Sequence, residues 1–162
     1  MKIVLGIDPG TATTGYGLVR NLPDGRLEAI SFGTFKTPAG MEAHRRLSML
    51  FEQMNELLLL HRPDAVAVEK LFFQRNISTA LAVGQARGVL MLAISEAGLD
   101  MAEYTPNEVK KAVTGYGSAG KHQVQEMVRV LLALQETPKP DDAADALAIA
   151  ITHLNTHIYG DK

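Results

Sequence analysis

Four carboxylates in this sequence stand where apolar segments end or begin. Asp8 ends the apolar run 2–7, Glu69 ends the run 65–68, and Asp142 and Asp145 open an apolar helix. A carboxylate at the end of a buried element is costly unless a cation meets it. Convergence of several such carboxylates therefore predicts bound divalent metal. Hard oxygen ligands favour Mg²⁺, with Mn²⁺ as a plausible substitute.

Two metal ions held by such acids favour one kind of chemistry. Cations about 4 Å apart activate a water and stabilise the leaving 3′ oxygen of an in-line displacement at phosphorus. The acids thus predict metal-dependent hydrolysis of phosphodiester bonds.

Two of the acids also have purely local interpretations. Asp8 could hydrogen-bond its own turn or belong to a phosphate-binding hairpin. Glu69 could form an ion pair with Lys70 or Arg75.

The helix that follows Pro140 begins with closely spaced aspartates. Asp142 and Asp145 are three residues apart and share a helix face, and the residues around them are mainly alanine and isoleucine. Asp141 fits a helix-capping role that complements the helix dipole. It is also four residues from Asp145, so spacing alone does not decide whether Asp141 or Asp142 is the ligand.

The segments that must position these acids alternate between strand and helix patterns. Strands are predicted at residues 2–7, 16–20, a stretch ending near 35, 65–69 and about 101–104. Helices are predicted at residues 41–62, 76–97, 106–113, 121–134 and after residue 140. We expect one α/β domain with a mixed sheet over residues 1–162. The helix at 76–97 is apolar nearly all round, so it should be buried or should meet a second subunit.

Composition excludes several classes of function. The chain has 162 residues, 46% hydrophobic and 21% charged, and no cysteine, which rules out disulfides and cysteine-ligated zinc. It resembles an ordinary soluble protein, no run of membrane-spanning length is expected, and the short apolar start predicts a cytoplasmic protein without a leader. The net charge of −2 hides a local bias, because residues 70–95 contain three basic residues and no acidic one. That bias is compatible with a nucleic-acid partner.

The motifs occur in an order that resembles a known family, the bacterial RuvC crossover junction endodeoxyribonucleases. The resemblance rests on Gly6-Ile7-Asp8-Pro9-Gly10, Thr14-Gly15-Tyr16-Gly17, Glu69, Gly84-Gln85-Ala86-Arg87-Gly88, Gly117-Ser118-Ala119 with Lys121, and Asp142-Ala143-Ala144-Asp145-Ala146-Leu147-Ala148. It implies a ribonuclease-H-like fold with a mixed five-stranded sheet flanked by helices. It also implies a homodimer that nicks a four-way (Holliday) DNA junction symmetrically in recombination and repair. RuvA and RuvB are the implied branch-migration partners.

The resemblance also assigns roles to individual residues. The metal-binding catalytic acids, holding two Mg²⁺ ions, would be Asp8, Glu69, Asp142 and Asp145. Lys110 and Lys121 match basic residues near the scissile phosphate, and Lys121 is counted among the catalytic residues. Phe72 matches an aromatic residue that meets bases at the junction centre, and Arg75 is the further expected DNA contact. A structural interpretation of the adjacent phenylalanines, that they belong to the core, stays open.

One other pair could bind metal, and three other classes of protein compete. His153 and His157 share a helix face, but no third ligand is in sight, so a solvated or dimer-facing pair is expected.

A sugar-kinase-like or heat-shock-protein-like ATPase uses a similar Asp8 hairpin but needs two such lobes. A junction-binding module without catalysis would not need four acids. A related RNA-processing nuclease is the harder alternative, and cleavage of DNA junctions but not of ribosomal RNA precursors would separate the two.

Overall fold

The computed structural model describes residues 1–10, 12–70 and 76–160. Its five strands are β1 (Ile3–Asp8), β2 (Thr13–Asn21), β3 (Leu27–Lys36), β4 (Ala65–Glu69) and β5 (Met101–Tyr104). Its five helices are α1 (Ala43–His61), α2 (Ile77–Glu96), α3 (Pro106–Thr114), α4 (Lys121–Leu131) and α5 (Asp141–Gly160). The mixed five-stranded sheet flanked by helices that we predicted is confirmed.

The sheet has the order β3-β2-β1-β4-β5. The first three strands form an antiparallel meander, whereas β4 runs parallel to β1 and to β5. Because β1 and β4 are parallel neighbours, their carboxyl ends reach the same edge of the sheet. Asp8 and Glu69, the last residues of these two strands, are therefore brought side by side by the topology.

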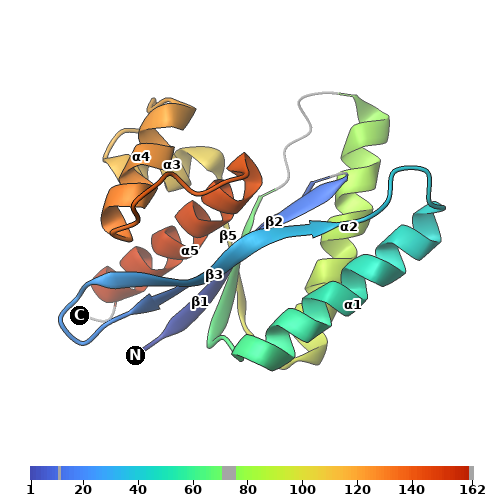
Figure 1. The fold of residues 1–162 in the computed structure, drawn as a ribbon, viewed down its shortest axis with the longest axis horizontal. Coiled ribbons are helices and arrows are strands. Elements are labelled where there is room, and N and C mark those ends of the chain that lie inside the picture. Colours follow the sequence, from blue (N-terminus) through green and yellow to red (C-terminus); the bar gives the residue numbers. More distant parts are fainter. Residues whose placement is uncertain (11, 71–75, 161–162) are drawn as a thin grey trace.

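Helices cover both faces of the sheet. In Figure 1, α1 and α2 lie on one face and α3, α4 and α5 on the other. Two apolar cores result. One packs Leu5, Ile7, Leu18 and Val66 against α1 and α2, and the other packs Val4, Val19 and Ala67 against the helices of the opposite face. This alternation along β1 is the period of two expected of a strand covered on both sides.

Three glycines let α5 lie unusually close to the sheet. A Cβ at Gly6 would stand 1.9 Å from the carbonyl oxygen of Ala146, and one at Gly15 would stand 2.0 Å from that of Asp142. A Cβ at Gly17 would meet Leu147 at 2.8 Å. Only glycine permits these approaches. The start of α5 is consequently held directly over the ends of β1 and β2, where Asp8 lies.

Local capping determines where α3 and α4 begin. Thr105 Oγ1 accepts a hydrogen bond from the main-chain N–H of Glu108 at 3.1 Å, and the Glu108 side chain accepts one from the Thr105 N–H at 3.3 Å. At α4, the N–H of Gly120 donates to Gln123 Oε1 at 2.9 Å. These caps place Lys110 on α3 and Lys121 at the first position of α4.

Two boundaries differ from the sequence prediction by three residues, and the others by at most two. Strand β2 begins at Thr13 rather than at residue 16, because Thr13 and Thr14 continue the pairing with β3. Helix α4 ends at Leu131 rather than at residue 134, since Ala133 adopts a left-handed φ of 53° that a helix cannot continue.

Helix α2 is half buried and half exposed. Its inner face, which includes Ala86, Leu90 and Ile94, packs in the core, while Ile77, Leu81 and Leu92 on the opposite side are exposed. Among the described residues it is the one helix long and apolar enough to cross a membrane by length and composition. The expectation that no segment has that length and composition is therefore wrong.

Candidate metal centre

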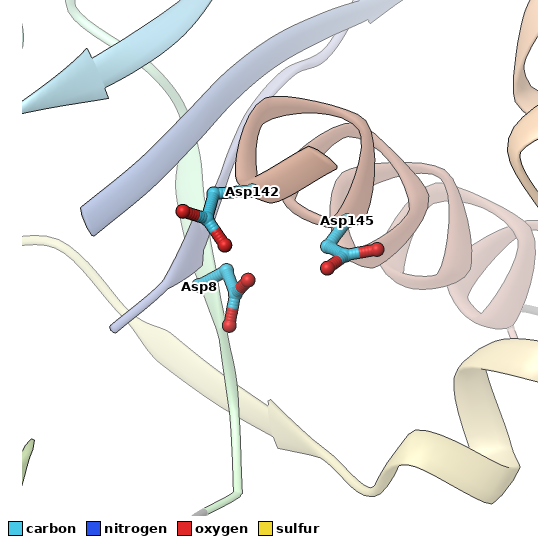
Figure 2. A group of neighbouring side chains, drawn as sticks. All are labelled: Asp8, Asp142 and Asp145. Atoms are coloured by element: carbon cyan, nitrogen blue, oxygen red, sulfur yellow. The ribbon is translucent and has the colours of Figure 1, made fainter. Parts of the chain in front are cut away.

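Three carboxylates converge at the carboxyl edge of the sheet. Oxygens of Asp8, Asp142 and Asp145 all lie within 4.8 Å of one another. Figure 2 shows Asp8 at the end of β1, next to the first turns of α5, which carry the other two. The arrangement confirms that Asp142 and Asp145 share a helix face and that this face is turned toward Asp8.

The structure also separates Asp142 from its neighbour. Thr13 Oγ1 donates a hydrogen bond to Asp142 Oδ2 at 3.0 Å and so orients that carboxylate within the cluster. Asp141 points elsewhere: it forms an exposed ion pair with Lys121 at 3.0 Å and accepts a hydrogen bond from Gln125 Nε2 at 3.0 Å. The Lys121 contact is also the main cause of the lowered pKa of Asp141. Of the two neighbours, Asp142 is thus the one that faces the carboxylate cluster.

Glu69 lies beside this cluster. Its carboxyl raises the pKa of Asp8 both by a side-chain hydrogen bond and by its charge, and its charge also raises the pKa of Asp145. The four acids named from the sequence therefore share one electrostatic environment, although only three of them fall within the 4.8 Å group.

Burial and crowding disfavour the charged forms of these acids in the metal-free protein. Burial, followed by the neighbouring carboxylates, raises the pKa of Asp8 far above its usual range. Burial raises the pKa of Asp145 to about 6, although Lys121 opposes the shift. Carboxyl groups that resist ionisation in the metal-free protein are stabilised as carboxylates when a cation binds among them. The donor set consists of hard oxygens, so it fits Mg²⁺ or Mn²⁺.

A pocket beside the acids gathers basic side chains. It has a volume of about 320 Å³, and Glu69, Asp145, Lys110 and Lys121 are among the residues that line it. Carboxylates that could hold metal and lysines that could bind a phosphate therefore face one space. Two other predicted DNA contacts, Phe72 and Arg75, lie outside the described residues.

The histidine pair of α5 is not the solvated or partner-facing pair that we expected. His153 is only 4% exposed, and its Nδ1 lies 2.7 Å from the hydroxyl of Tyr104 on β5. Its ring is 4.3 Å from that of His157, centroid to centroid. Burial lowers the pKa of His153 to about 4. His153 is therefore a neutral core residue that ties α5 to the sheet, while His157 is exposed.

Two contacts at the site were not predicted from the sequence. Thr13 was not named as a partner of Asp142. Arg87 was named only within the basic segment 70–95 and the motif Gly84-Gln85-Ala86-Arg87-Gly88, with no contact assigned to it. Arg87 in fact lies inside the fold, where it contacts the main chain of Glu69. The available signal was that Arg87 is the one charged residue in the mostly apolar stretch 77–95.

Comparison with known proteins gives consistent matches along the chain. The model of the family Crossover junction endodeoxyribonuclease RuvC matches residues 4–153. Crossover junction endodeoxyribonuclease RuvC of Syntrophomonas wolfei is 54% identical over 154 residues, which cover 95% of this chain and 89% of that protein. The solved Thermus thermophilus RuvC structure superimposes with a TM-score of 0.91 at 39% identity, over 98% of this chain and 96% of that one. T. thermophilus RuvC in complex with Holliday junction substrate matches over the same shares, with a TM-score of 0.89 and 37% identity.

Proposed function

Because the chain belongs to the RuvC family of crossover junction endodeoxyribonucleases, we propose that Asp8, Glu69, Asp142 and Asp145 are its metal-binding catalytic acids. The chain has the ribonuclease-H-like fold of that family and is a metal-dependent nuclease that resolves four-way (Holliday) DNA junctions in recombination and repair. The observation that carries the assignment of the site is the convergence of three carboxylates within 4.8 Å. The whole of residues 1–162 would serve as one nuclease domain.

Two Mg²⁺ ions are the proposed occupants of the site, with Mn²⁺ as a substitute. Bound among these acids, the ions would supply activation of the attacking water and stabilisation of the charge on the leaving 3′ oxygen. The residues of the chain would hold them: Thr13 orients Asp142, and Asp8 is buried, where the attraction between a carboxylate and a cation is strong. The mutual repulsion of the four carboxylates, which bound cations would relieve, supports this proposal.

Lys110 and Lys121 are the proposed phosphate contacts. Lys121 is also the proposed catalytic lysine. Lys121 opens α4, so a phosphate beside it would meet both the ammonium group and the positive end of the helix. In the free protein this ammonium pairs with Asp141. In the complex, a DNA phosphate would replace Asp141 as the partner of Lys121. Phe72 and Arg75 remain proposed contacts to bases and backbone at the junction centre.

A homodimer is the proposed assembly. One site cuts one strand, so two symmetrical nicks need two subunits related by a two-fold axis. The exposed apolar residues Ile77, Leu81 and Leu92 recur along one face of α2, which also carries Gly84 and Gly88. A continuous exposed apolar face of this kind supports an interface. RuvA and RuvB as branch-migration partners, and a cytoplasmic location, are further proposals that rest on the family.

Incubation with a mobile four-way junction and Mg²⁺ tests the function. We expect paired nicks at symmetrical positions on two strands, read on a denaturing gel, and no cleavage after chelation of the metal. A linear duplex of the same sequence and a structured ribosomal RNA precursor serve as controls. Equal cleavage of the junction and of the RNA would instead support the RNA-processing class.

Replacement of Lys121 by alanine tests the phosphate contact. We expect weaker cleavage and a dependence of junction binding on salt whose log-log slope is smaller by about one, because one phosphate contact is lost. The matched control is Arg26→Ala, since Arg26 is exposed and pairs with Asp24 in the turn between β2 and β3, away from the acids. An unchanged salt slope for Lys121→Ala would remove Lys121 from the DNA contacts.

A further inference from the structure

Arg87 is a charged side chain buried on the inner side of α2. Only 10% of the side chain is exposed, and its Nη2 forms an ion pair with Glu103 on β5 at 2.8 Å. Its Nη1 donates a hydrogen bond to the main-chain carbonyl of Glu69 at 2.5 Å. A buried guanidinium is tolerated only where such partners are present. One of the two partners is the residue that ends β4 at the metal centre.

The register of the sheet explains why this carbonyl needs a donor from outside. Along a strand, successive main-chain groups point to opposite neighbours. The N–H of Lys70 donates to Tyr104 on β5 at 2.8 Å, so the main-chain groups of Glu69 face the β1 side. The β1–β4 pairing ends at Ile7 and Val68. In this register the position whose N–H would reach the Glu69 carbonyl is occupied by Pro9, one residue beyond the end of β1.

Proline has no main-chain N–H. The ladder therefore cannot satisfy the carbonyl of Glu69, which is left as an acceptor at the end of the strand. The Arg87 guanidinium occupies the place of the missing donor. The same guanidinium pairs with Glu103 on β5. Arg87 therefore links the last residue of β4 to the neighbouring strand.

We propose that Arg87 is a positioning residue of the metal centre, which holds the end of β4 so that the Glu69 carboxyl stays beside Asp8. The inference rests on the proposed role of Glu69 as a ligand. Arginine is suited to this task because its planar group donates to two acceptors in fixed directions, whereas lysine offers a single point charge. Groups that orient metal ligands typically change metal affinity or activity about 10–100-fold when they are removed.

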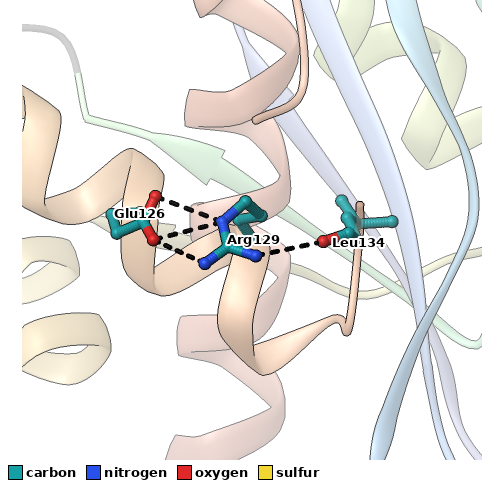
Figure 3. A network of polar contacts seen from close by, with 3 residues as sticks. All are labelled: Glu126, Arg129 and Leu134. Carbon is teal, nitrogen blue, oxygen red and sulfur yellow. Dashed lines mark hydrogen bonds and ion pairs between the residues drawn. The ribbon is translucent and has the colours of Figure 1, made fainter. Parts of the chain in front are cut away.

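A second arginine of the chain has the same chemistry away from the acids and serves as the control. Arg129 on α4 pairs with Glu126 at 2.6 Å and donates to the main-chain carbonyl of Leu134 at 3.3 Å, as Figure 3 shows. It thus bridges a carboxylate and a carbonyl, as Arg87 does. The loss of Arg129 should affect the end of α4 and leave the metal centre unchanged.

The experiment compares Arg87→Met, Arg87→Lys and Arg129→Met with the wild-type protein. Binding of Mn²⁺ to the DNA-free protein is measured by electron paramagnetic resonance, and junction cleavage is measured as a function of Mg²⁺ concentration. Melting temperature and junction binding without divalent metal are recorded in parallel. We expect Arg87→Met to weaken Mn²⁺ binding and to raise the Mg²⁺ concentration at half-maximal cleavage by about 10–100-fold. Arg87→Lys should recover part of this loss, and Arg129→Met should match the wild type in both metal measurements.

Two outcomes would overturn the inference. If Arg87→Met lowers the melting temperature but leaves Mn²⁺ binding and the Mg²⁺ midpoint unchanged, Arg87 serves only the fold. If Arg87→Met does not fold, Arg87→Lys decides, and wild-type metal dependence in that variant rejects the positioning role. Glu69→Gln separates this question from the ligand assignment. If Glu69→Gln binds metal and cuts normally, the proposed site itself is wrong, whereas its failure beside normal Arg87 variants rejects the inference alone.

Discussion

Asp8→Asn, Glu69→Gln and Asp145→Asn are each expected to abolish junction cleavage while junction binding stays close to that of the wild type. Metal ions supply several kcal/mol of transition-state stabilisation. Because about 1.4 kcal/mol corresponds to a factor of ten in rate, the loss should be on the order of 10³-fold. Binding depends on the basic surface, which these substitutions leave in place. Gel shifts and single-turnover cleavage on the same junction measure the two effects separately.

Asp141→Asn is the matched control for these variants. Asp141 neighbours Asp142 in sequence but is exposed and pairs with Lys121, so cleavage should stay within a few-fold of the wild type. A variant of Asp8, Glu69 or Asp145 that kept wild-type cleavage with Mg²⁺ would lose its assignment as a ligand.

The same Asp8→Asn variant should be more stable than the wild type when metal is absent. Burial and the neighbouring acids raise the pKa of Asp8, so the folded protein binds this proton more tightly than the unfolded chain. Its contribution to stability therefore falls as pH rises from the unfolded-state pKa toward the folded-state pKa. Asparagine carries no charge and escapes this loss. At pH 8 with chelator, the melting temperature of Asp8→Asn should exceed that of the wild type. The difference should be about 2–4 °C for each kcal/mol gained in the free energy of unfolding.

Added Mg²⁺ provides the complementary measurement. It should raise the melting temperature of the wild type, because a ligand that binds only the folded state stabilises it. It should raise that of Asp8→Asn much less. An Asp8→Asn protein that melts below the wild type without metal would contradict the electrostatic account of the site.

Leu81→Glu combined with Leu92→Glu is expected to give a folded monomer that no longer makes paired nicks. Leu81 and Leu92 are 62% and 52% exposed on the outer face of α2, so the substitutions leave the core unaltered. In a two-fold interface each subunit contributes the same face, which would place like charges against each other. Light scattering should give 17.5 kDa instead of twice that mass, and residual products should carry single nicks.

Leu60→Glu is the control, because Leu60 is an exposed leucine on α1, outside the proposed interface. It should leave the protein dimeric. Ala86 is unsuitable for this test, since it faces the core and an acid there would disturb the fold. Paired cuts made by a protein that stays monomeric both free and on the junction would exclude the proposed interface.

Much of the fold followed from local patterns in the sequence. Strand and helix periods predicted every element that the structure describes, with boundaries that shift by a few residues at β2 and α4. Asp8 and Glu69 could be named because a charged residue that ends an apolar strand stands out in one dimension. The order of the motifs was enough to identify the family.

The sequence by itself thus determined which elements form and which acids are candidate metal ligands, because periodicity and the placement of charge are local properties. Only the tertiary structure shows that Asp142, and not Asp141, lies in the cluster with Asp8 and Asp145, since both share a helix face with Asp145. The choice depends on how α5 is rotated over the sheet, which is set by its backbone contact with Gly6 and Gly15 far away in the sequence. The burial of His153 and the contact of Arg87 with Glu69 were decided in the same way, because burial and hydrogen-bond partners depend on residues that only the folded chain brings together.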